Sequence, residues 1–274
     1  MTIGTAVRQG TELLARAGVP EPRITAELLV CHAIQRERSY LFAHPEQELR
    51  EVEWLHYGRW LDERMKGKPL QYITRKQEFY GREFRVSPDV LIPRPETEFL
   101  VEAVMKRRPT AGVIIDVGAG SGAIAVTLAL ELKARVFATD ISAAALSVAS
   151  SNAMRLGAKA DFVQTDLLTG IRDNVADVVV SNPPYIPETD RATLQREVRD
   201  WEPALALFAG TEGLDIYRRL IPEAWRVLKP GGLLALEMGQ GQSDAIAALA
   251  EDWRNHELIP DLAGILRVLI CEKP

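Results

Sequence analysis

The sequence predicts an α/β fold in which helices cover both faces of a mostly parallel sheet, preceded by a small helical module. From Val113 onward, short apolar runs alternate with helical stretches, which is the order that a parallel sheet requires. These runs are apolar throughout rather than at every second residue, as expected for strands buried on both faces. Before residue 76, apolar residues recur only at helical intervals.

The first module covers residues 1–75. Its first predicted helix starts near Ile3 and is stopped by Gly18 and the proline that follows two residues later. A second helix begins near Pro22, because proline suits the first turn of a helix. A third is predicted from about Glu48 to Lys66. No strand-like alternation interrupts this region, so we expect a helical bundle.

A connector follows at residues 76–95. Aromatic and β-branched residues surround Gly81 here, a composition typical of a short hairpin or an extended segment. The stretch Pro93-Arg94-Pro95 then leads into a helix, and we expect one further domain over residues 96–274. In that domain we predict strands at 113–117, 135–139, 160–164, 177–181, 233–237 and 265–271, with helices from 96, at 123–132, 142–156, 214–228 and 243–253.

Composition excludes several classes of protein. The chain has 274 residues, 47% of them hydrophobic, and its net charge of −5 argues against a main role in gripping nucleic-acid phosphates. Its two cysteines and four histidines show no metal-type spacing, so we expect no metal site. The start lacks the features of a signal peptide and no run is long enough to span a bilayer. We therefore expect a cytoplasmic protein with no membrane association.

A glycine-rich turn follows the first strand of the predicted sheet. Asp116-Val117-Gly118-Ala119-Gly120-Ser121-Gly122 connects that strand to a helix, and Asp140 ends the next strand. Glycines let the backbone approach a ligand closely, and a strand-end carboxylate can accept hydrogen bonds from both ribose hydroxyls of an adenosine. A tight turn without a ligand is the less favoured interpretation.

The turn alone leaves two cofactors open. Its spacing is Gly-x-Gly-x-Gly rather than the Gly-x-Gly-x-x-Gly associated with a dinucleotide pyrophosphate. Leu228-Lys229-Pro230-Gly231-Gly232, ahead of a late strand, resembles the turn often seen in methyltransferases. This likeness favours S-adenosylmethionine over NAD.

Asn182-Pro183-Pro184-Tyr185 is the most specific motif in the chain. It follows an apolar strand directly, at the end where open α/β sheets bind ligands. The two prolines stiffen the segment and offer no backbone donor. The side-chain oxygen of Asn182 and the carbonyl of Pro183 can then accept the two hydrogens of a substrate NH₂ group, while Tyr185 stacks on its flat face.

Such a clamp suits a planar nitrogen, whose delocalised lone pair makes it a poor nucleophile. Two acceptors on its hydrogens raise the electron density on the nitrogen and position it for attack on a methyl group. The alternative is a rigid proline turn with no ligand. The clamp itself does not distinguish a glutamine amide from the amino group of adenine.

The combined motifs resemble the bacterial release-factor glutamine methyltransferases over nearly the whole chain. The segments that carry this resemblance are Pro69–Ile73, Phe79–Gly81, Leu91–Glu98, Asp116–Ile124, Ser181–Ile186 and Glu237–Gly239. Asn-Pro-Pro-Tyr also occurs in adenine-methylating DNA enzymes, whereas Arg94-Pro95-Glu96-Thr97-Glu98 is similar to the glutamine-modifying group. Arg75 stands where relatives usually have glycine, and Leu167 where some carry an aromatic residue.

The resemblance implies a Rossmann-like domain of seven strands, a β-hairpin connector and an N-terminal helical bundle. Our hypothesis is that the helical bundle helps to dock the substrate. The resemblance also implies transfer of a methyl group from S-adenosyl-L-methionine, leaving S-adenosyl-L-homocysteine, to the side-chain N5 of the glutamine in the Gly-Gly-Gln motif of class 1 peptide chain release factors. The implied cofactor-binding residues are Gly118, Ala119, Gly120, Ser121, Gly122, Asp140, Asp166, Leu167 and Asn182. Asn182, Pro183, Pro184 and Tyr185 would bind the substrate, with Asn182, Pro183 and Tyr185 catalytic.

Several questions stay open at this point. The roles of Arg94, Glu96, Glu237 and Gln242 are not decided by the sequence, although all four are candidates for supporting the site. Methylation of adenine in DNA or RNA is the alternative activity, and a cofactor-binding module without turnover is the non-enzymatic one. We expect a monomer whose partners are release factors, with no direct nucleic-acid target.

Overall fold

The computed structural model describes all 274 residues and divides into two compact units. One unit comprises Met1–Arg75 together with Gln195–Trp201, and the other comprises Lys76–Leu194 and Glu202–Pro274. Residues 195–201, which the sequence assigns to the catalytic domain, therefore belong with the helical unit. The structure contains no helix long and apolar enough to cross a membrane.

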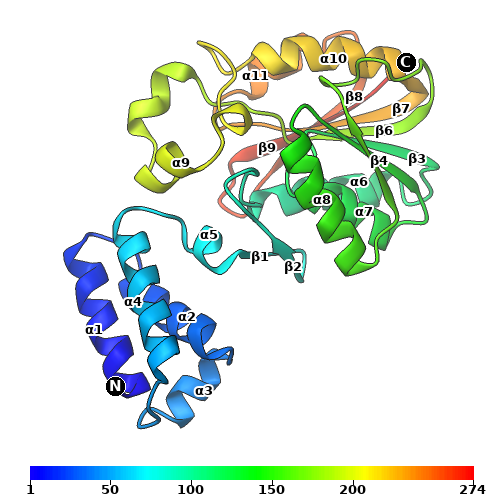
Figure 1. The fold of residues 1–274 in the computed structure, drawn as a ribbon. Helices are drawn as coiled ribbons and strands as arrows, with labels where there is room; N and C mark the ends of the chain where they lie inside the picture. The colour runs from blue at the N-terminus through cyan, green and yellow to red at the C-terminus, as the bar shows by residue number, and fades with distance from the viewer. The chain divides into compact units, whose positions relative to one another are not determined.

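The helical unit consists of α1 (Ile3–Arg16), α2 (Pro22–Ile34), α3 (Arg38–Ala43), α4 (Glu51–Met65), α5 (Leu70–Thr74) and α9 (Arg196–Trp201) (Figure 1). Tyr57 of α4 is fully buried, and its hydroxyl donates to the carbonyl of Ala6 in α1 at 2.9 Å. A Cβ at Gly10 would lie 1.9 Å from the same hydroxyl, so only glycine lets the two helices approach this closely. The short helices α3, of six residues, and α5, of five, were not predicted. Segments of this length are too short to show a periodic pattern of apolar residues.

Two contacts hold α9 in the helical unit. The guanidinium of Arg64, almost fully buried, pairs with Glu197 at 2.7 Å. The ammonium of Lys68 lies 5.8 Å from the centre of the Trp201 ring, within range of a cation–π interaction. The α9 segment is therefore attached to this unit by charge and aromatic contacts.

The connector forms a β-hairpin of β1 (Lys76–Phe79) and β2 (Arg82–Arg85), joined by a two-residue turn. Both turn residues, Tyr80 and Gly81, have positive φ, which matches the twist of a tight hairpin. Phe79 and Phe84 pack edge to face and join the core of the α/β unit. The residue just before the hairpin, Arg75, also has a positive φ of 60° and caps α5, which explains why glycine suits this position.

The α/β unit contains a seven-stranded sheet in the order β5-β4-β3-β6-β7-β9-β8 (Figure 1). The first five of these strands are parallel, whereas β9 runs antiparallel to both β7 and β8. The strands are β3 (Val113–Val117), β4 (Arg135–Asp140), β5 (Ala160–Gln164), β6 (Ala176–Ser181), β7 (Leu228–Glu237), β8 (Arg254–Pro260) and β9 (Leu266–Glu272).

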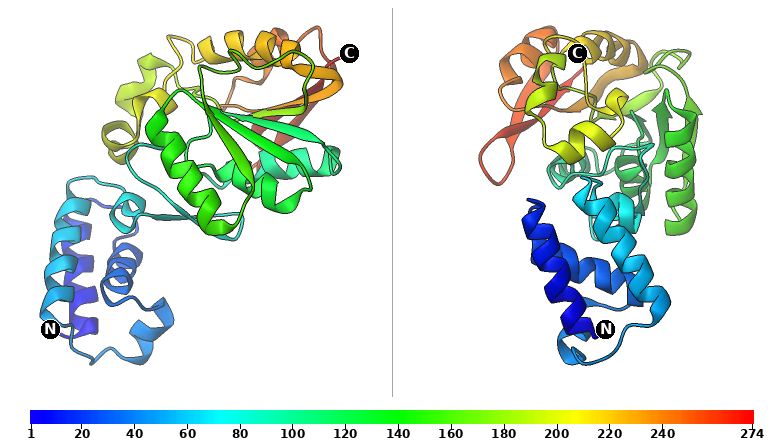
Figure 2. Two further views of the ribbon diagram at one scale, coloured as in Figure 1. Left: turned by 45° about the vertical axis from the view of Figure 1, so that its right-hand side comes forward. Right: turned by 60° about the vertical axis from the view of Figure 1, so that its left-hand side comes forward.

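Helices cover both faces of this sheet, as two views of the ribbon make clear (Figure 2). The helices are α6 (Glu96–Arg107), α7 (Ala123–Glu131), α8 (Ala143–Leu156), α10 (Asp215–Val227) and α11 (Ser243–Leu249), with 3₁₀ turns η1 (Glu188–Thr193) and η2 (Ala204–Ala206). Alternate residues of one strand enter different cores: Val178 and Val180 pack under α6 and α7, while Val179 packs under α10. This explains the uninterrupted apolar runs, since both sides of each central strand are buried.

The predicted Rossmann-like fold is confirmed, with two differences in detail. Strand β8 was not predicted from the pattern, because it is a mostly exposed edge strand with a polar sequence. Strand β7 begins at Leu228 and includes Lys229–Gly232, which the pattern assigns to a turn. A register shift at the start of its pairing with β6 accommodates these residues.

Candidate active site

The candidate residues come together at the carboxyl ends of the parallel strands. The glycine-rich turn follows β3, Asp140 ends β4, Asn182 follows β6 and Glu237 ends β7. Since β4, β3, β6 and β7 are adjacent in the sheet, residues as far apart in sequence as Gly118 and Glu237 are placed along one edge. This edge is where open α/β sheets bind their ligands.

The glycine turn leaves backbone free for a ligand. Gly118, Gly120 and Gly122 all have positive φ, which side chains disfavour. Gly118 is exposed and a Cβ there would meet nothing within 4 Å, so its backbone borders open space. Gly122 has another role, because a Cβ there would lie 3.1 Å from Ala149 of α8. Ala119 and Ser121 between them are buried.

Asp140 is positioned by the backbone around it. One carboxylate oxygen accepts from the amide of Gly120 at 2.9 Å, and the other accepts from the amide of Ser142 at 2.8 Å. Each oxygen keeps a second lone pair for a further donor. The side chain is thus held at the end of β4 in a geometry that suits a ligand with two hydroxyl groups.

Asp116 lies beneath the turn and is fully buried. One of its oxygens accepts from the amide of Ala125 at 3.1 Å, whereas the other has no hydrogen-bond partner. Burial raises the pKa of this carboxyl well above its usual value, and the charge of Asp140 adds to the effect. A buried acceptor without a partner is costly, so this oxygen is an independent indication that a ligand donor belongs nearby.

The structure places Asp166 and Leu167 in the segment between β5 and β6. Asp166 forms a half-exposed ion pair with Arg219 at 2.6 Å. Leu167 has a positive φ of 50° and packs partly against the core under α10. One oxygen of Asp166 accepts from Arg219, and the other is open to a further donor.

Asn182 is oriented by Thr97, a residue that sequence reasoning did not single out. The side-chain nitrogen of Asn182 donates to the hydroxyl of Thr97 in the first turn of α6 at 3.0 Å. The preceding residue, Ser181, donates to the carbonyl of Val117 at 2.6 Å and ties the end of β6 to β3. Pro183 is buried directly after Asn182. The amide of Asn182 is therefore held on a rigid strand end.

Gln242 holds the other end of the motif. Its side-chain nitrogen donates to the carbonyl of Tyr185 at 2.9 Å, and its oxygen accepts from the amide of Gly239 at 3.0 Å. A Cβ at Gly213 would lie 2.2 Å from the Tyr185 carbonyl oxygen, and one at Gly239 would lie 3.0 Å from the tyrosine ring. These contacts are compatible only with glycine. Burial raises the pKa of Tyr185 to about 12, so its phenol is neutral at physiological pH.

Glu237 lies at the end of β7 and is 1% exposed. Burial raises the pKa of this carboxyl to about 7, against the lowering effect of hydrogen bonds with Thr97 and Asn182. Its Oε2 atom has no partner. An ionisable group next to the clamp therefore titrates near neutral pH.

The stretch Arg94–Glu98 packs around the clamp. Arg94 forms an ion pair with Glu202, whose side chain is only 1% exposed. Thr97 accepts from Asn182, and Glu98 accepts from the backbone amide of Tyr80 at 2.8 Å, which ties the hairpin turn to α6. This arrangement gives physical roles to Arg94 and Glu98, and shows why α6 starts where it does relative to the site.

Asn152 is a second residue that sequence reasoning missed. It is fully buried in α8, donates to the carbonyls of Ser121 and Arg85 at 2.9 Å each, and accepts from the amide of Arg85 at 2.8 Å. One side chain thereby connects the glycine turn to the hairpin. An asparagine in the middle of a helix with no motif around it carries no signal of this role.

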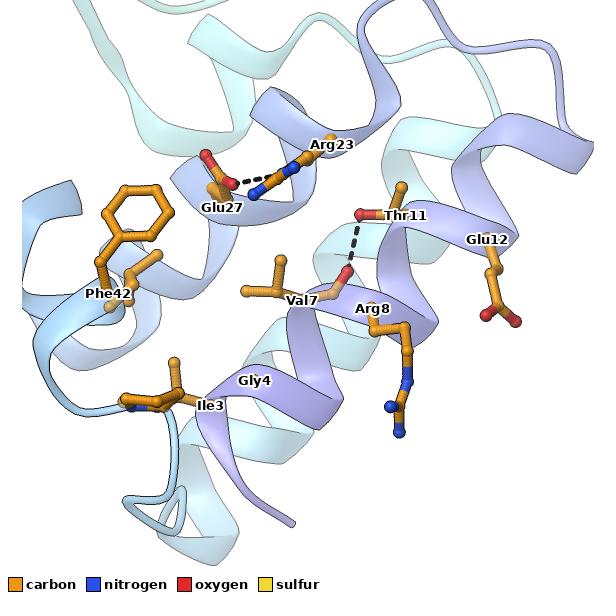
Figure 3. Close-up of a pocket in the computed structure, with 11 residues that line it drawn as sticks. Ile3, Gly4, Val7, Arg8, Thr11, Glu12, Arg23, Glu27 and Phe42 are labelled. Atoms are coloured by element: carbon orange, nitrogen blue, oxygen red, sulfur yellow. Dashed lines mark hydrogen bonds and ion pairs between the residues drawn. The ribbon is translucent and has the colours of Figure 1, made fainter.

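The helical unit has a groove of its own. A cavity of about 450 Å³ lies between α1, α2 and α3 (Figure 3). Its apolar lining includes Ile3, Val7 and Phe42, and the Phe42 side chain is 59% exposed. Arg23 and Glu27, which form an ion pair at 3.0 Å, lie at its edge.

Comparison with known proteins decides the family. Residues 5–74 match the family model described as the PrmC N-terminal domain, and residues 95–200 match the methyltransferase small domain. A release factor glutamine methyltransferase from Koribacter versatilis is 46% identical over 278 residues, covering 100% of this chain and 99% of that protein. The chain belongs to the release factor glutamine methyltransferase family. It is therefore an enzyme of the methyltransferase class that modifies glutamine.

Solved structures support the fold. A 16S rRNA methyltransferase from T. thermophilus, solved with AdoMet and guanosine, gives a TM-score of 0.55 at 21% identity over 73% of this chain and 50% of that one. The E. cuniculi complex responsible for methylation of the eRF1 termination factor gives 0.51 at 21% identity, over 68% of this chain and 99% of that one. Both share the Rossmann-like methyltransferase fold with the α/β unit.

Proposed function

We propose that this enzyme methylates the side-chain N5 of the glutamine in the Gly-Gly-Gln motif of class 1 peptide chain release factors, using S-adenosyl-L-methionine. Family membership supports a release factor as the substrate. The observation that carries the chemistry is the Asn182 amide, held by Thr97 at the end of β6. This arrangement leaves the Asn182 oxygen free as an acceptor for a planar NH₂ group.

The residues of the glycine turn fit S-adenosylmethionine. Gly118 offers exposed backbone without steric hindrance, and the unpartnered oxygen of Asp116 lies beneath the same turn. Gly118 to Gly122 would hold the methionine part, Asp140 the ribose hydroxyls, and Asp166 with Leu167 the adenine. When bound, this cofactor supplies an electrophilic methyl group on a sulfonium sulfur, and S-adenosyl-L-homocysteine is the product.

The clamp would prepare the substrate nitrogen. The two amide hydrogens of the glutamine donate to the Asn182 oxygen and the Pro183 carbonyl, which raises electron density on the nitrogen. The neutral ring of Tyr185 covers the flat face of the amide. The nitrogen would accept the methyl group that the bound cofactor supplies, and one of its two hydrogens would then leave to water as a proton. No strong base is needed before attack.

The test is transfer of labelled methyl groups to a release factor, to DNA and to RNA in parallel reactions. We expect label only in the release factor, at the glutamine of the Gly-Gly-Gln motif, as located by peptide mass spectrometry. Label in DNA or RNA alone would establish adenine methylation instead and overturn the proposal. Asn182→Ala should abolish transfer while leaving most cofactor binding; unchanged turnover would contradict the role of the clamp.

We further propose that the helical unit docks the release factor through the groove around Phe42. Exposed apolar surface bordered by charged side chains is typical of protein-binding sites. A protein substrate needs such a surface in addition to the glutamine site. We expect the enzyme to act as a monomer in the cytoplasm, with no direct nucleic-acid target.

A further inference from the structure

Three polar side chains from three elements meet behind the clamp. Asn182 follows β6, Thr97 lies in the first turn of α6, and Glu237 ends β7. The Asn182 nitrogen donates to the Thr97 oxygen at 3.0 Å. The register of β6 against β7, with Ser181 opposite Leu236, brings Glu237 beside Asn182, and both Thr97 and Asn182 lower the pKa of its carboxyl. Thr97 is 4% exposed and Glu237 1%, so water does not replace these contacts.

The chemistry of the three groups determines the direction of every hydrogen bond. An ionised carboxylate only accepts, so the Thr97 hydroxyl donates to Glu237 and keeps its oxygen as an acceptor. Asn182 must then present its NH₂ group to Thr97 and Glu237. Its Oδ1 atom consequently lies on the opposite side of the amide, available to a substrate.

We propose that Thr97 and Glu237 are positioning residues which hold the Asn182 amide with Oδ1, rather than the NH₂ group, toward the glutamine nitrogen. This inference rests on the proposed function. It explains why Asn182 presents its oxygen to the substrate rather than its NH₂ group, which has nearly the same shape. A flipped Asn182 would present donors to a substrate that also offers donors. That arrangement cannot bind the glutamine NH₂ group.

The ionisation state of Glu237 determines the direction of the hydrogen bonds among Glu237, Thr97 and Asn182. Burial is the main cause that raises the pKa of Glu237 to about 7; Glu96 raises it further, and Arg267 lowers it. The phenols of Tyr185 and Tyr217 also face this carboxyl, and burial keeps both neutral. Protonated Glu237 can donate to Thr97, which lets Thr97 donate in turn to Oδ1 of a flipped Asn182. The ionised form is therefore the productive one.

The experiment compares Thr97→Val, Thr97→Ser and Glu237→Gln in the full-length enzyme, with a release factor as substrate. Thr97→Val has nearly the same shape but lacks the hydroxyl, and we expect kcat to fall about tenfold or more, roughly what one oriented hydrogen bond contributes. Thr97→Ser restores the hydroxyl and should recover most of the activity. Cofactor affinity, measured by calorimetry, should be unchanged in both.

Thr127→Val is the matched control. Thr127 is also fully buried, in α7, and its hydroxyl has no hydrogen-bond partner. This variant should keep wild-type kcat, which separates the loss of the Thr97 hydroxyl from the general effect of a buried threonine-to-valine change.

The pH profile gives a readout that a purely structural role would not change. Wild-type kcat should rise with pH as Glu237 ionises, and Glu237→Gln should be slower and lack this rise. Wild-type kcat in Thr97→Val, equal impairment of Thr97→Ser and Thr97→Val, or an unaltered pH profile in Glu237→Gln would each overturn the proposal. Failure of the proposed function has a different signature, since the wild-type enzyme would then transfer no label to the release factor.

Discussion

At the scale of single residues, the site depends on buried polar groups whose partners come from other elements. Glu237 interacts with Thr97 and Asn182, while Asp116 keeps one oxygen without a partner. Groups of this kind cost stability when they are charged, because burial removes them from water. These groups at the strand ends are therefore kept at a cost to the stability of the fold.

Glu237 should make stability depend on pH. Its pKa of about 7 in the folded protein exceeds the ordinary value of 4.5 for a glutamate, so the folded state binds the proton more tightly than the unfolded chain does. The free energy of unfolding should therefore fall as pH rises from about 4.5 to about 7, by about 3 kcal/mol at most, and stay level for this group above that. Urea unfolding of the ligand-free protein between pH 5 and pH 8 measures this change.

Glu237→Gln is the control, because glutamine has nearly the same shape and does not titrate. The difference in unfolding free energy between wild type and variant should shift in favour of the variant as pH rises. A difference that does not vary with pH would show that Glu237 does not titrate in this range.

Asp140 offers a prediction about the cofactor. Asp140→Ala removes the carboxylate proposed to accept from the ribose, so the Kd for S-adenosylmethionine should rise about tenfold or more, comparable to one or two charge-assisted hydrogen bonds. Isothermal titration calorimetry measures it. Asp140 also accepts from Gly120 and Ser142, so circular dichroism of the variant checks that the turn still folds. An unaltered Kd would contradict the ribose assignment.

At the scale of elements, the hairpin and the glycine turn are coupled through α8. Asn152 makes three hydrogen bonds, to Ser121 in the turn and to both backbone groups of Arg85 in β2. One side chain pairs with all three backbone groups, since it offers one acceptor and two donors in one plane. The hairpin is therefore linked to the glycine turn through one buried side chain.

Asn152→Ala should lower the free energy of unfolding by about 2–3 kcal/mol, because it leaves buried backbone groups unpaired. Chemical denaturation measures the change. Asn152→Asp keeps the acceptor and loses the donors, so it should be comparably destabilised. Ser150→Ala on the exposed face of the same helix is the control, with an expected change close to zero. Equal stability of Asn152→Ala and Ser150→Ala would contradict this role of Asn152.

At the scale of the whole molecule, the chain forms two units, and one of them is built from two separate stretches of sequence. Residues 195–201 follow the clamp in sequence yet belong to the helical unit, through Glu197 on Arg64 and Trp201 on Lys68. The chain therefore passes between the units at Arg75, at Leu194 and again at Trp201. A truncation at residue 75 would remove the packing partners of α9, so point variants are the better test of docking.

Phe42→Asp tests the groove of the helical unit. The side chain is 59% exposed, so the fold should tolerate the change. We expect KM for the release factor to rise about tenfold, comparable to the loss of one interface anchor, while the Kd for S-adenosylmethionine is unaffected. Leu262→Asp is the control, because Leu262 is 95% exposed in the turn after β8. If both variants keep the wild-type KM, the groove does not dock the substrate.

The sequence by itself determined the fold class, the helical character of residues 1–75, and the family. Apolar runs and glycine turns are local patterns, and the motifs from Arg94 to Glu98 and from Asn182 to Tyr185 are contiguous segments that one chain displays directly. Strand β8 was not predicted, because an exposed edge strand has no pattern of apolar residues.

Only the tertiary structure decided which residues support Asn182. Thr97 lies 85 positions before Asn182 and Glu237 lies 55 positions after it. Elsewhere in the site, Gln242 bonds Tyr185 across 57 positions and Asn152 bonds Ser121 across 31, and these pairs depend on strand order. The sheet places β6 between β3 and β7, and α6 against it, so that an asparagine, a threonine and a glutamate from distant segments share one buried site. A hydrogen bond requires atoms within about 3 Å, and only the folded chain brings them to that distance.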